Sequence, residues 1–283
     1  MPIPGLSLVG LLPQALGIEY LKTVCSQPDP AKCRSEWQVA RARYGQRSAP
    51  LAPDVQSLPP GCSSHLAAVR SHKRFARTYQ GVKVDFALVE IEGLLAYQAN
   101  VAFKTPKLAI SPAIPGKSIP QDLLDLCLPT RLPAVEPKWS RTGDENVGAI
   151  SFYCGDDFEF RILAGGLWPP DIQSATQGVG IEVGMGFGLV YVMRSAGQCY
   201  LVNGYHRTIN LMLAGHTWVP CLIADVDPTF NPALVYGGPV GRALNQASPP
   251  ATCADYRRAD PTKLRKQHRV INVSWSQTLV PDE

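Results

Sequence analysis

The sequence predicts an α+β protein whose core is a small mixed β-sheet with short helices. Three observations support this prediction. Residues 199–223, CYLVNGYHRTINLMLAGHTWVPCLI, read as a strand, a polar turn, a short helix and a second strand. Residues 189–193 are separated from that stretch by Ser195-Ala196-Gly197, a spacing typical of a hairpin. A third β-forming run occupies Val82–Val89.

Each element of the 199–223 stretch has a local cause. Residues 200–202 favour a strand, and Asn203-Gly204 forms a turn because both residues tolerate positive φ. Residues 208–214 carry apolar side chains at helical spacing. Gly215 is suited to end that helix in the left-handed conformation. The apolar run at 219–223 then resumes as a strand.

Residues 1–62, which precede the core, are expected to form a helical extension and a linker. Two helices are expected within it, at Leu11–Thr23 and Ala31–Tyr44, followed by a linker over residues 49–62. Residues 63–80 predict a further helix, with Ser63 or Ser64 as its N-cap.

We place the core at residues 63–225. Within it, Gln121–Leu128 predicts a short helix, and Val147–Phe152 with Phe158–Leu163 predicts a hairpin. Residues 226–283 are expected to form a proline-rich segment and a terminal strand, over Val270–Val280, that returns to the core sheet.

The composition excludes few function classes. The net charge of +4 permits nucleic-acid or nucleotide binding without requiring it. The eight cysteines include no C-x-x-C pair, which disfavours a structural zinc site, and those at 127, 199 and 221 lie in apolar runs typical of buried thiols. We find no signal peptide and no apolar run of ~20 residues. We therefore expect a soluble cytoplasmic protein without a membrane partner.

The turn after residue 202 is a candidate phosphate site. The first N–H groups of a helix lack intrahelical partners and carry partial positive charge. Glycine allows a ligand to approach the backbone closely, and histidine and arginine add side-chain donors at the same end. The other interpretation is an ordinary strand-turn-helix connection with two solvated polar residues. The candidate binding residues are Asn203, Gly204, Tyr205, His206 and Arg207.

The NGYHR pattern, followed by a short apolar helix, AG and VP, resembles the ParB/sulfiredoxin-like superfamily. Val89–Gln98 resembles the opening strand of that superfamily, which leads into a polar loop over the nucleotide phosphates. The resemblance implies binding or hydrolysis of ATP or CTP, with Gln98 as the loop residue at the site and Asn100 as its neighbour. Two departures limit it. Tyr205 stands where sulfiredoxins carry their catalytic cysteine, and the GERR motif and helical DNA-binding region of partitioning proteins are not found.

Together, the turn and the resemblance predict a nucleotide-binding protein with phosphoryl-transfer or phosphodiester-hydrolysing activity, an NTPase or a ParB-like nuclease. Arg207 would neutralise phosphate charge, His206 would donate a hydrogen bond or transfer a proton, and Gln98 would position water or substrate. Mg²⁺ is a second candidate cofactor. Asp156, Asp157 and Glu159 could supply its carboxylates, with Glu90, Glu92 and Glu182 as alternatives, but acidic turns are frequent and no metal ligand is assigned.

A second hypothesis is a non-enzymatic DNA-associated protein that uses nucleotide as a switch. Its support is two basic clusters, within residues 70–77 and 253–269, the first of which includes Phe75 and is followed by Tyr79. A solvated helix face is the more common explanation of a cluster like the first one. A third possibility is that the fold is kept and the activity lost.

Overall fold

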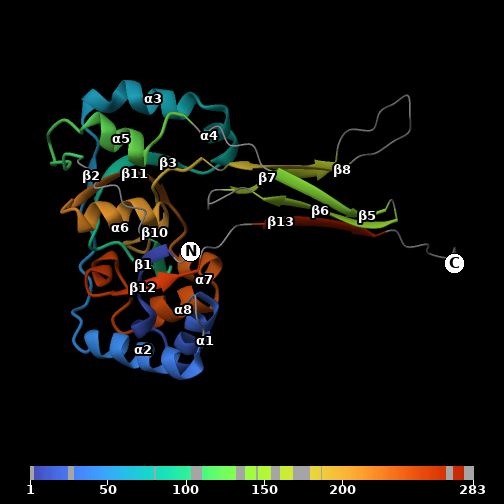
Figure 1. The fold of residues 1–283 in the computed structure, drawn as a ribbon. Helices are drawn as coiled ribbons and strands as arrows, with labels where there is room; N and C mark the ends of the chain where they lie inside the picture. Colours follow the sequence, from blue (N-terminus) through green and yellow to red (C-terminus); the bar gives the residue numbers. More distant parts are fainter. Residues whose placement is uncertain are drawn as a thin grey trace. The chain divides into compact units, whose positions relative to one another are not determined.

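The structure is a computed structural model, and its described residues are 3–24, 29–79, 81–102, 110–131, 138–144, 146–153, 160–167, 179–185, 187–265 and 270–276. The protein is α+β with mixed sheets (Figure 1). Its chain divides into two units. The first comprises residues 1–130 and 188–265, and the second comprises residues 131–187 and 266–283.

The first unit holds all the helices of the described chain. They are α1 (Gln14–Val24), α2 (Pro30–Arg43), α3 (Ser63–Ser71), α4 (Lys73–Thr78), α5 (Gln121–Cys127), α6 (Tyr205–Leu213), α7 (Pro232–Tyr236) and α8 (Gly238–Gln246), with 3₁₀ turns η1 (Val9–Leu11), η2 (Pro60–Cys62) and η3 (Cys253–Arg257). Among the described residues, no helix combines the length and the apolar character needed to cross a bilayer.

Two sheets form the centre of the first unit. The larger one has the strand order β10 (Gln198–Asn203), β9 (Tyr191–Ser195), β11 (Trp218–Asp225), β3 (Val84–Glu90), β2 (Val55–Ser57). It is mixed, because β11 runs parallel to β9 and antiparallel to β3. The smaller one is β12 (Asp260–Leu264), β1 (Ile3–Ser7), β4 (Asn100–Ala102), with both pairings antiparallel.

Helix α6 packs between these two sheets, against β11 on one side and β4 on the other (Figure 1). Its apolar side is buried completely at Ile209, Leu211 and Met212. The facing strands supply fully buried Leu222 and Val101. Since buried apolar side chains contribute ~1.5–3 kcal/mol each, this packing fixes the position of the turn that begins α6.

The second unit is built from two antiparallel arrangements. One is a three-stranded sheet, β13 (Val270–Ser276), β6 (Val147–Tyr153), β5 (Lys138–Gly143), and the other is the pair β7 (Phe160–Leu167) and β8 (Val179–Met185). The small core of this unit gathers Phe152, Val183 and Val273 around Ile271.

The predicted strand, turn, helix and strand over residues 199–223 are confirmed as β10, α6 and β11, and the predicted hairpin is β9–β10. Helix α6 begins at Tyr205, three residues before the predicted start. Gly215 has φ +95°, as expected for a residue that ends a helix. The short helix predicted at Gln121–Leu128 is confirmed as α5, and the two N-terminal helices as α1 and α2.

Three local predictions were wrong. The opening strand expected at Val89–Gln98 does not extend past Glu90, because the chain turns at Gly93, where a Cβ would lie 2.8 Å from the Leu51 carbonyl oxygen. The N-cap of α3 is Cys62, since the Ser63 hydroxyl donates back to the Pro60 carbonyl. Strands β6 and β7 exist but do not pair, and the predicted turn residues Asp156 and Asp157 lie outside the described residues.

The terminal strand also differs from the prediction. Strand β13 pairs with β6 rather than with the sheet of the first unit. The register places Ile271 opposite Phe152 and Val273 opposite Ile150, so apolar side chains share one face of the second unit. The chain does return to the first unit earlier, through β12, which pairs with β1.

Candidate functional site

The predicted phosphate turn lies at the junction of β10 and α6. Gly204 has φ +90° and is the N-cap of α6, with no side-chain cap hydrogen bond. A Cβ at this position would lie 2.8 Å from Val190 Cγ2, so the site requires glycine for both conformation and space. Asn203 precedes it and donates from Nδ2 to the Leu189 carbonyl at 2.9 Å. The backbone N–H groups of the first turn of α6 therefore have no side-chain acceptor from the N-cap.

Tyr205, predicted to line the phosphate site, points into the protein. Its side chain is buried, and its hydroxyl accepts a hydrogen bond from the Tyr97 backbone N–H at 2.8 Å. The Tyr97 ring packs edge-on against it, with centroids 5.9 Å apart. Burial raises the pKa of the Tyr205 phenol well above its ordinary value, so the hydroxyl stays neutral. This side chain orients the 97–98 backbone and is not placed to contact a ligand.

His206 is half-buried in the first turn of α6. Its Nδ1 lies 3.1 Å from both the backbone nitrogen and the carbonyl oxygen of Ala102, in β4. If Nδ1 accepts from the Ala102 N–H, the neutral ring carries its proton on Nε2. If Nδ1 instead donates to the Ala102 carbonyl, the neutral ring carries its proton on Nδ1.

Arg207 donates from Nη1 to two backbone carbonyls, those of Leu126, at 3.0 Å, and Gly188. These contacts join the last turn of α5 to the segment that enters β9. The guanidinium is therefore engaged with the protein itself, and its predicted role in neutralising phosphate remains a prediction.

The predicted loop residue Gln98 lies in the segment next to the turn. Its Nε2 donates to the Asn100 carbonyl at 2.9 Å, and its own carbonyl accepts from the Tyr256 hydroxyl. Asn100 Oδ1 is buried without a hydrogen-bond partner among the described residues. The contacts from Tyr97 to Tyr205 and from Ala102 to His206 join this segment to the turn. The structure thus brings together the two stretches that the sequence singled out.

The contacts described above do not identify carboxylates that would bind Mg²⁺. Asp156, Asp157 and Glu159 lie outside the described residues, as does the side chain of Glu182. Within the described part of the chain, no three His, Cys, Asp or Glu side chains gather closely enough to hold a metal ion.

The first basic cluster lacks the stacking surface that a nucleic-acid site would need. Phe75 is buried and stacks on Phe86, with centroids 6.0 Å apart, and Tyr79 packs against Tyr191 at 5.5 Å. Arg70 pairs with Asp85 at 3.2 Å. The aromatic residues of this cluster contribute to the core, so the first cluster gives the DNA hypothesis no specific support.

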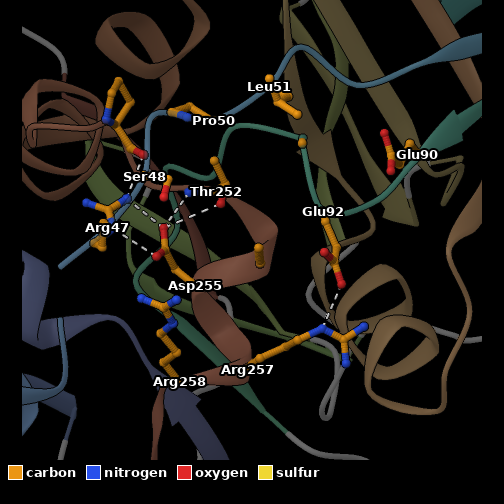
Figure 2. Close-up of a pocket in the computed structure, with 13 residues that line it drawn as sticks. Arg47, Ser48, Pro50, Leu51, Glu90, Glu92, Thr252, Asp255, Arg257 and Arg258 are labelled. Carbon is orange, nitrogen blue, oxygen red and sulfur yellow. Dashed lines mark hydrogen bonds and ion pairs between the residues drawn. The ribbon is translucent and has the colours of Figure 1, made fainter.

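A separate cavity of about 390 Å³ opens elsewhere on the first unit (Figure 2). It is bounded by the segment after α2, the end of β3, the loop before η3, and η3 itself. Its lining residues are Arg47, Ser48, Pro50, Leu51, Glu90, Glu92, Gly93, Pro250, Thr252, Ala254, Asp255, Arg257 and Arg258.

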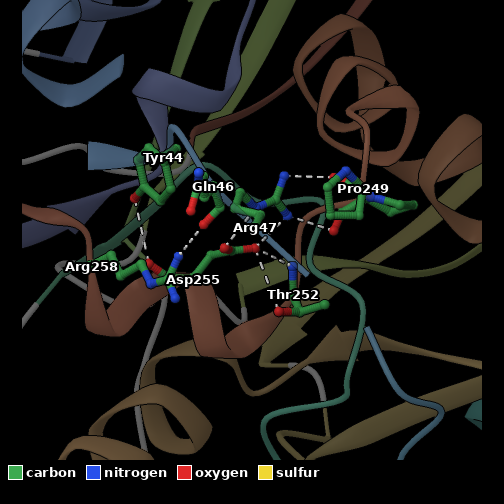
Figure 3. A network of polar contacts seen from close by, with 8 residues as sticks. Tyr44, Gln46, Arg47, Pro249, Thr252, Asp255 and Arg258 are labelled. Atoms are coloured by element: carbon green, nitrogen blue, oxygen red, sulfur yellow. Dashed lines mark hydrogen bonds and ion pairs between the residues drawn. The ribbon is translucent and has the colours of Figure 1, made fainter. Parts of the chain in front are cut away.

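One wall of this cavity is a buried Arg47–Asp255 ion pair (Figure 3). Arg47 Nε and Nη2 donate to the two carboxylate oxygens at 2.9 and 2.7 Å. The Arg47 Nη1 and Nη2 groups also donate to the carbonyls of Pro249 and Pro250, each at 2.6 Å. Asp255 in turn accepts from the Thr252 backbone N–H at 2.8 Å. The pair is therefore supported by hydrogen bonds to the backbone as well as by its own two contacts.

Sequence reasoning missed this pair because its members are 208 positions apart, one between the second predicted helix and the linker and the other in a basic cluster. A weak local signal exists at one end. Thr252 and Asp255 form a capping box, which predicts the start of η3 but not its arginine partner.

Comparisons with protein-family models, with curated proteins and with solved structures gave no match.

Proposed function

We propose that this chain binds the phosphate groups of a nucleotide at the amino end of α6 and is a phosphoryl-transfer or phosphodiester-hydrolysing enzyme. The observation that carries the proposal is that α6 starts at a left-handed glycine without a side-chain cap. The first amides of a helix are hydrogen-bond donors in a region of partial positive charge, which suits an anion.

The neighbouring segment supports the same proposal. Hydrogen bonds from the backbone of Tyr97 and Ala102 join the segment that carries Gln98 to Tyr205 and His206 of α6. With Nδ1 of His206 accepting from Ala102, the ring would offer an Nε2–H group to a phosphate oxygen. Gln98 would position the attacking water or the substrate. Arg207 would contribute its positive charge near the turn while its Nη1 donates to backbone carbonyls of the protein.

The proposal extends to a ParB/sulfiredoxin-like fold and to ATP or CTP as the ligand. The elements that support this are β10, the Gly204 turn, α6, Gly215 and a β11 strand that contains Val219-Pro220. Mg²⁺ prefers one or two carboxylates together with phosphate oxygens, so nucleotide is expected to supply part of its coordination.

Titration calorimetry with ATP, CTP and GTP, with and without Mg²⁺, tests binding. His206→Glu is the most informative variant, because an acidic residue in the first turn favours the helix dipole but repels phosphate. We expect at least a roughly tenfold loss of affinity. Ala31→Glu adds the same charge to the first turn of α2, at an exposed position, and should leave affinity unchanged. Equal affinities for the two variants, or no binding of any nucleotide, would contradict the proposal.

Turnover is tested separately, by phosphate release from the bound nucleotide and by nicking of plasmid DNA. We expect Gln98→Ala to lower the rate at saturating nucleotide and to change the dissociation constant little. Binding without any turnover would remove the enzymatic part of the proposal and keep the phosphate site.

A further inference from the structure

The walls of the 390 Å³ cavity are joined by contacts between separate segments of the first unit. The Ala254 N–H donates to the Glu92 carbonyl at 3.3 Å, which joins η3 to the turn after β3. Gly93 lies directly against the segment after α2, where a Cβ would be 2.8 Å from the Leu51 carbonyl oxygen. The Arg47–Asp255 pair closes the remaining side. A preformed cavity of this size falls within the range of small-molecule sites.

Four charged side chains on the rim retain hydrogen-bonding capacity. Within the described chain, Arg257 uses only Nε, which donates to Glu92 Oε1 at 2.8 Å, and Arg258 uses only Nη1, which donates to the Gln46 carbonyl. Glu90 accepts one long contact, from the Asp54 N–H at 3.4 Å. Guanidinium N–H groups and carboxylate oxygens are therefore both present among the residues that line the cavity.

Donors and acceptors come from different elements. The arginines belong to η3 and its end, and the glutamates to the end of β3 and the turn after it (Figure 2). Arg47 and Asp255 satisfy each other, so the rim has two positive and two negative side chains and no net charge. A simple anion would meet the two carboxylates, and a simple cation would meet the two guanidinium groups.

We propose that this cavity binds a small zwitterion of the amino-acid class. The ligand carboxylate binds Arg257 and Arg258, for which arginine is suited by its bidentate geometry. The ligand ammonium group binds Glu90 and Glu92. The Arg257–Glu92 ion pair, whose side chains are 44% and 47% exposed, opens at little cost because exposed pairs contribute little to stability.

This site is independent of the turn at Gly204. It takes a ligand without phosphate, and a polyphosphate would be repelled by the glutamates. An experiment that refutes one of the two proposals therefore does not refute the other.

The test uses the full chain and titration calorimetry with the twenty free amino acids, at concentrations up to about 10 mM. For the best binder, the N-acetyl form removes the ammonium charge and the amide form removes the carboxylate. We expect each to bind at least about tenfold more weakly than the free amino acid. No saturable binding by any amino acid, or equal binding of the N-acetyl form, would overturn the proposal.

Two variants assign the binding to the cavity. Arg258→Gln and Glu90→Gln remove one charge from each side, and both are expected to weaken binding at least about tenfold. Arg258 is exposed and Glu90 half-buried, so the fold should persist, which an unchanged urea midpoint would verify. Arg194→Gln, in an exposed pair with Asp225, is the matched control and should bind normally. Normal binding by both cavity variants would contradict the assignment.

Discussion

Replacing Arg47 by methionine should destabilise the first unit far more than breaking a surface ion pair does. The Arg47 and Asp255 side chains are only 7% and 8% exposed. Arg47→Met removes two hydrogen bonds to the carboxylate and two to backbone carbonyls, and leaves a buried charge without its counter-ion. Losing one member of a buried pair costs ~3–5 kcal/mol, so we expect a loss of that size in the free energy of unfolding.

The assay is urea unfolding followed by circular dichroism, with the slope of the transition checked for constancy. Arg194→Met is the matched control, because Arg194 contacts both oxygens of Asp225, at 2.5 and 2.9 Å, with side chains 41% and 59% exposed. Such a pair contributes ~0–1 kcal/mol. If Arg47→Met costs no more than Arg194→Met, the reasoning from burial is refuted.

A double-mutant cycle isolates the pair itself. Asp255→Asn keeps an acceptor for the Thr252 N–H but removes the charge. If the two side chains act together, the cost of the double variant falls below the sum of the single costs by about 2 kcal/mol. Strictly additive costs would show that Arg47 acts only through the carbonyls of Pro249 and Pro250.

Three further outcomes follow from the structure. Burial lowers the pKa of His216, whose Nδ1 has no partner among the described residues, so the unfolded state binds protons more readily. Stability should therefore be greatest above about pH 6.5 and decrease as the pH falls below that value, and His216→Gln should flatten this dependence in urea midpoints measured from pH 5 to 8. Gly204→Ala should lower the urea midpoint more than Gly215→Ala, because both have positive φ, costing ~1–2 kcal/mol, but only the first Cβ meets a neighbour, Val190. Burial raises the pKa of the Cys199 thiol to about 11 and of Cys127 to about 12. In a Cys25→Ser/Cys154→Ser background, a thiol reagent should modify the remaining cysteines only upon unfolding, and rapid modification of the native protein would contradict their burial at positions 33, 62, 127, 199, 221 and 253.

The local parts of the fold were predictable where chemistry and spacing act over a few residues. Asn203-Gly204, the apolar spacing of α6 and Gly215 each specify a short-range conformation, and all three agree with the structure. The start of α6 was placed too late because Tyr205 is buried and helical through tertiary packing, which a polar-looking turn does not reveal.

Pairings between distant segments were not predictable in the same way. Strand β6 was expected to pair with its neighbour in sequence but pairs with β13, which matches its apolar register. The same limit applies to the sites. His206 and Gln98 were recognised from local motifs, whereas Arg47 finds Asp255 only once the fold brings their segments together. The inward orientation of the Tyr205 side chain depends on its hydrogen bond with the Tyr97 backbone N–H. No local sequence pattern specifies that contact.

The position of β1 in the smaller sheet has a consequence for biosynthesis. It is the central strand, with Ile3 opposite Leu264 and Gly5 opposite both Thr262 and Ala102. On the ribosome, β1 can meet β4 early, but its other edge stays open until residues 260–264 emerge. Such an unpaired edge is a site for wrong association during synthesis. Nascent chains stalled before residue 260 should therefore be markedly more prone to aggregate and to recruit chaperones than chains released a few residues after 264.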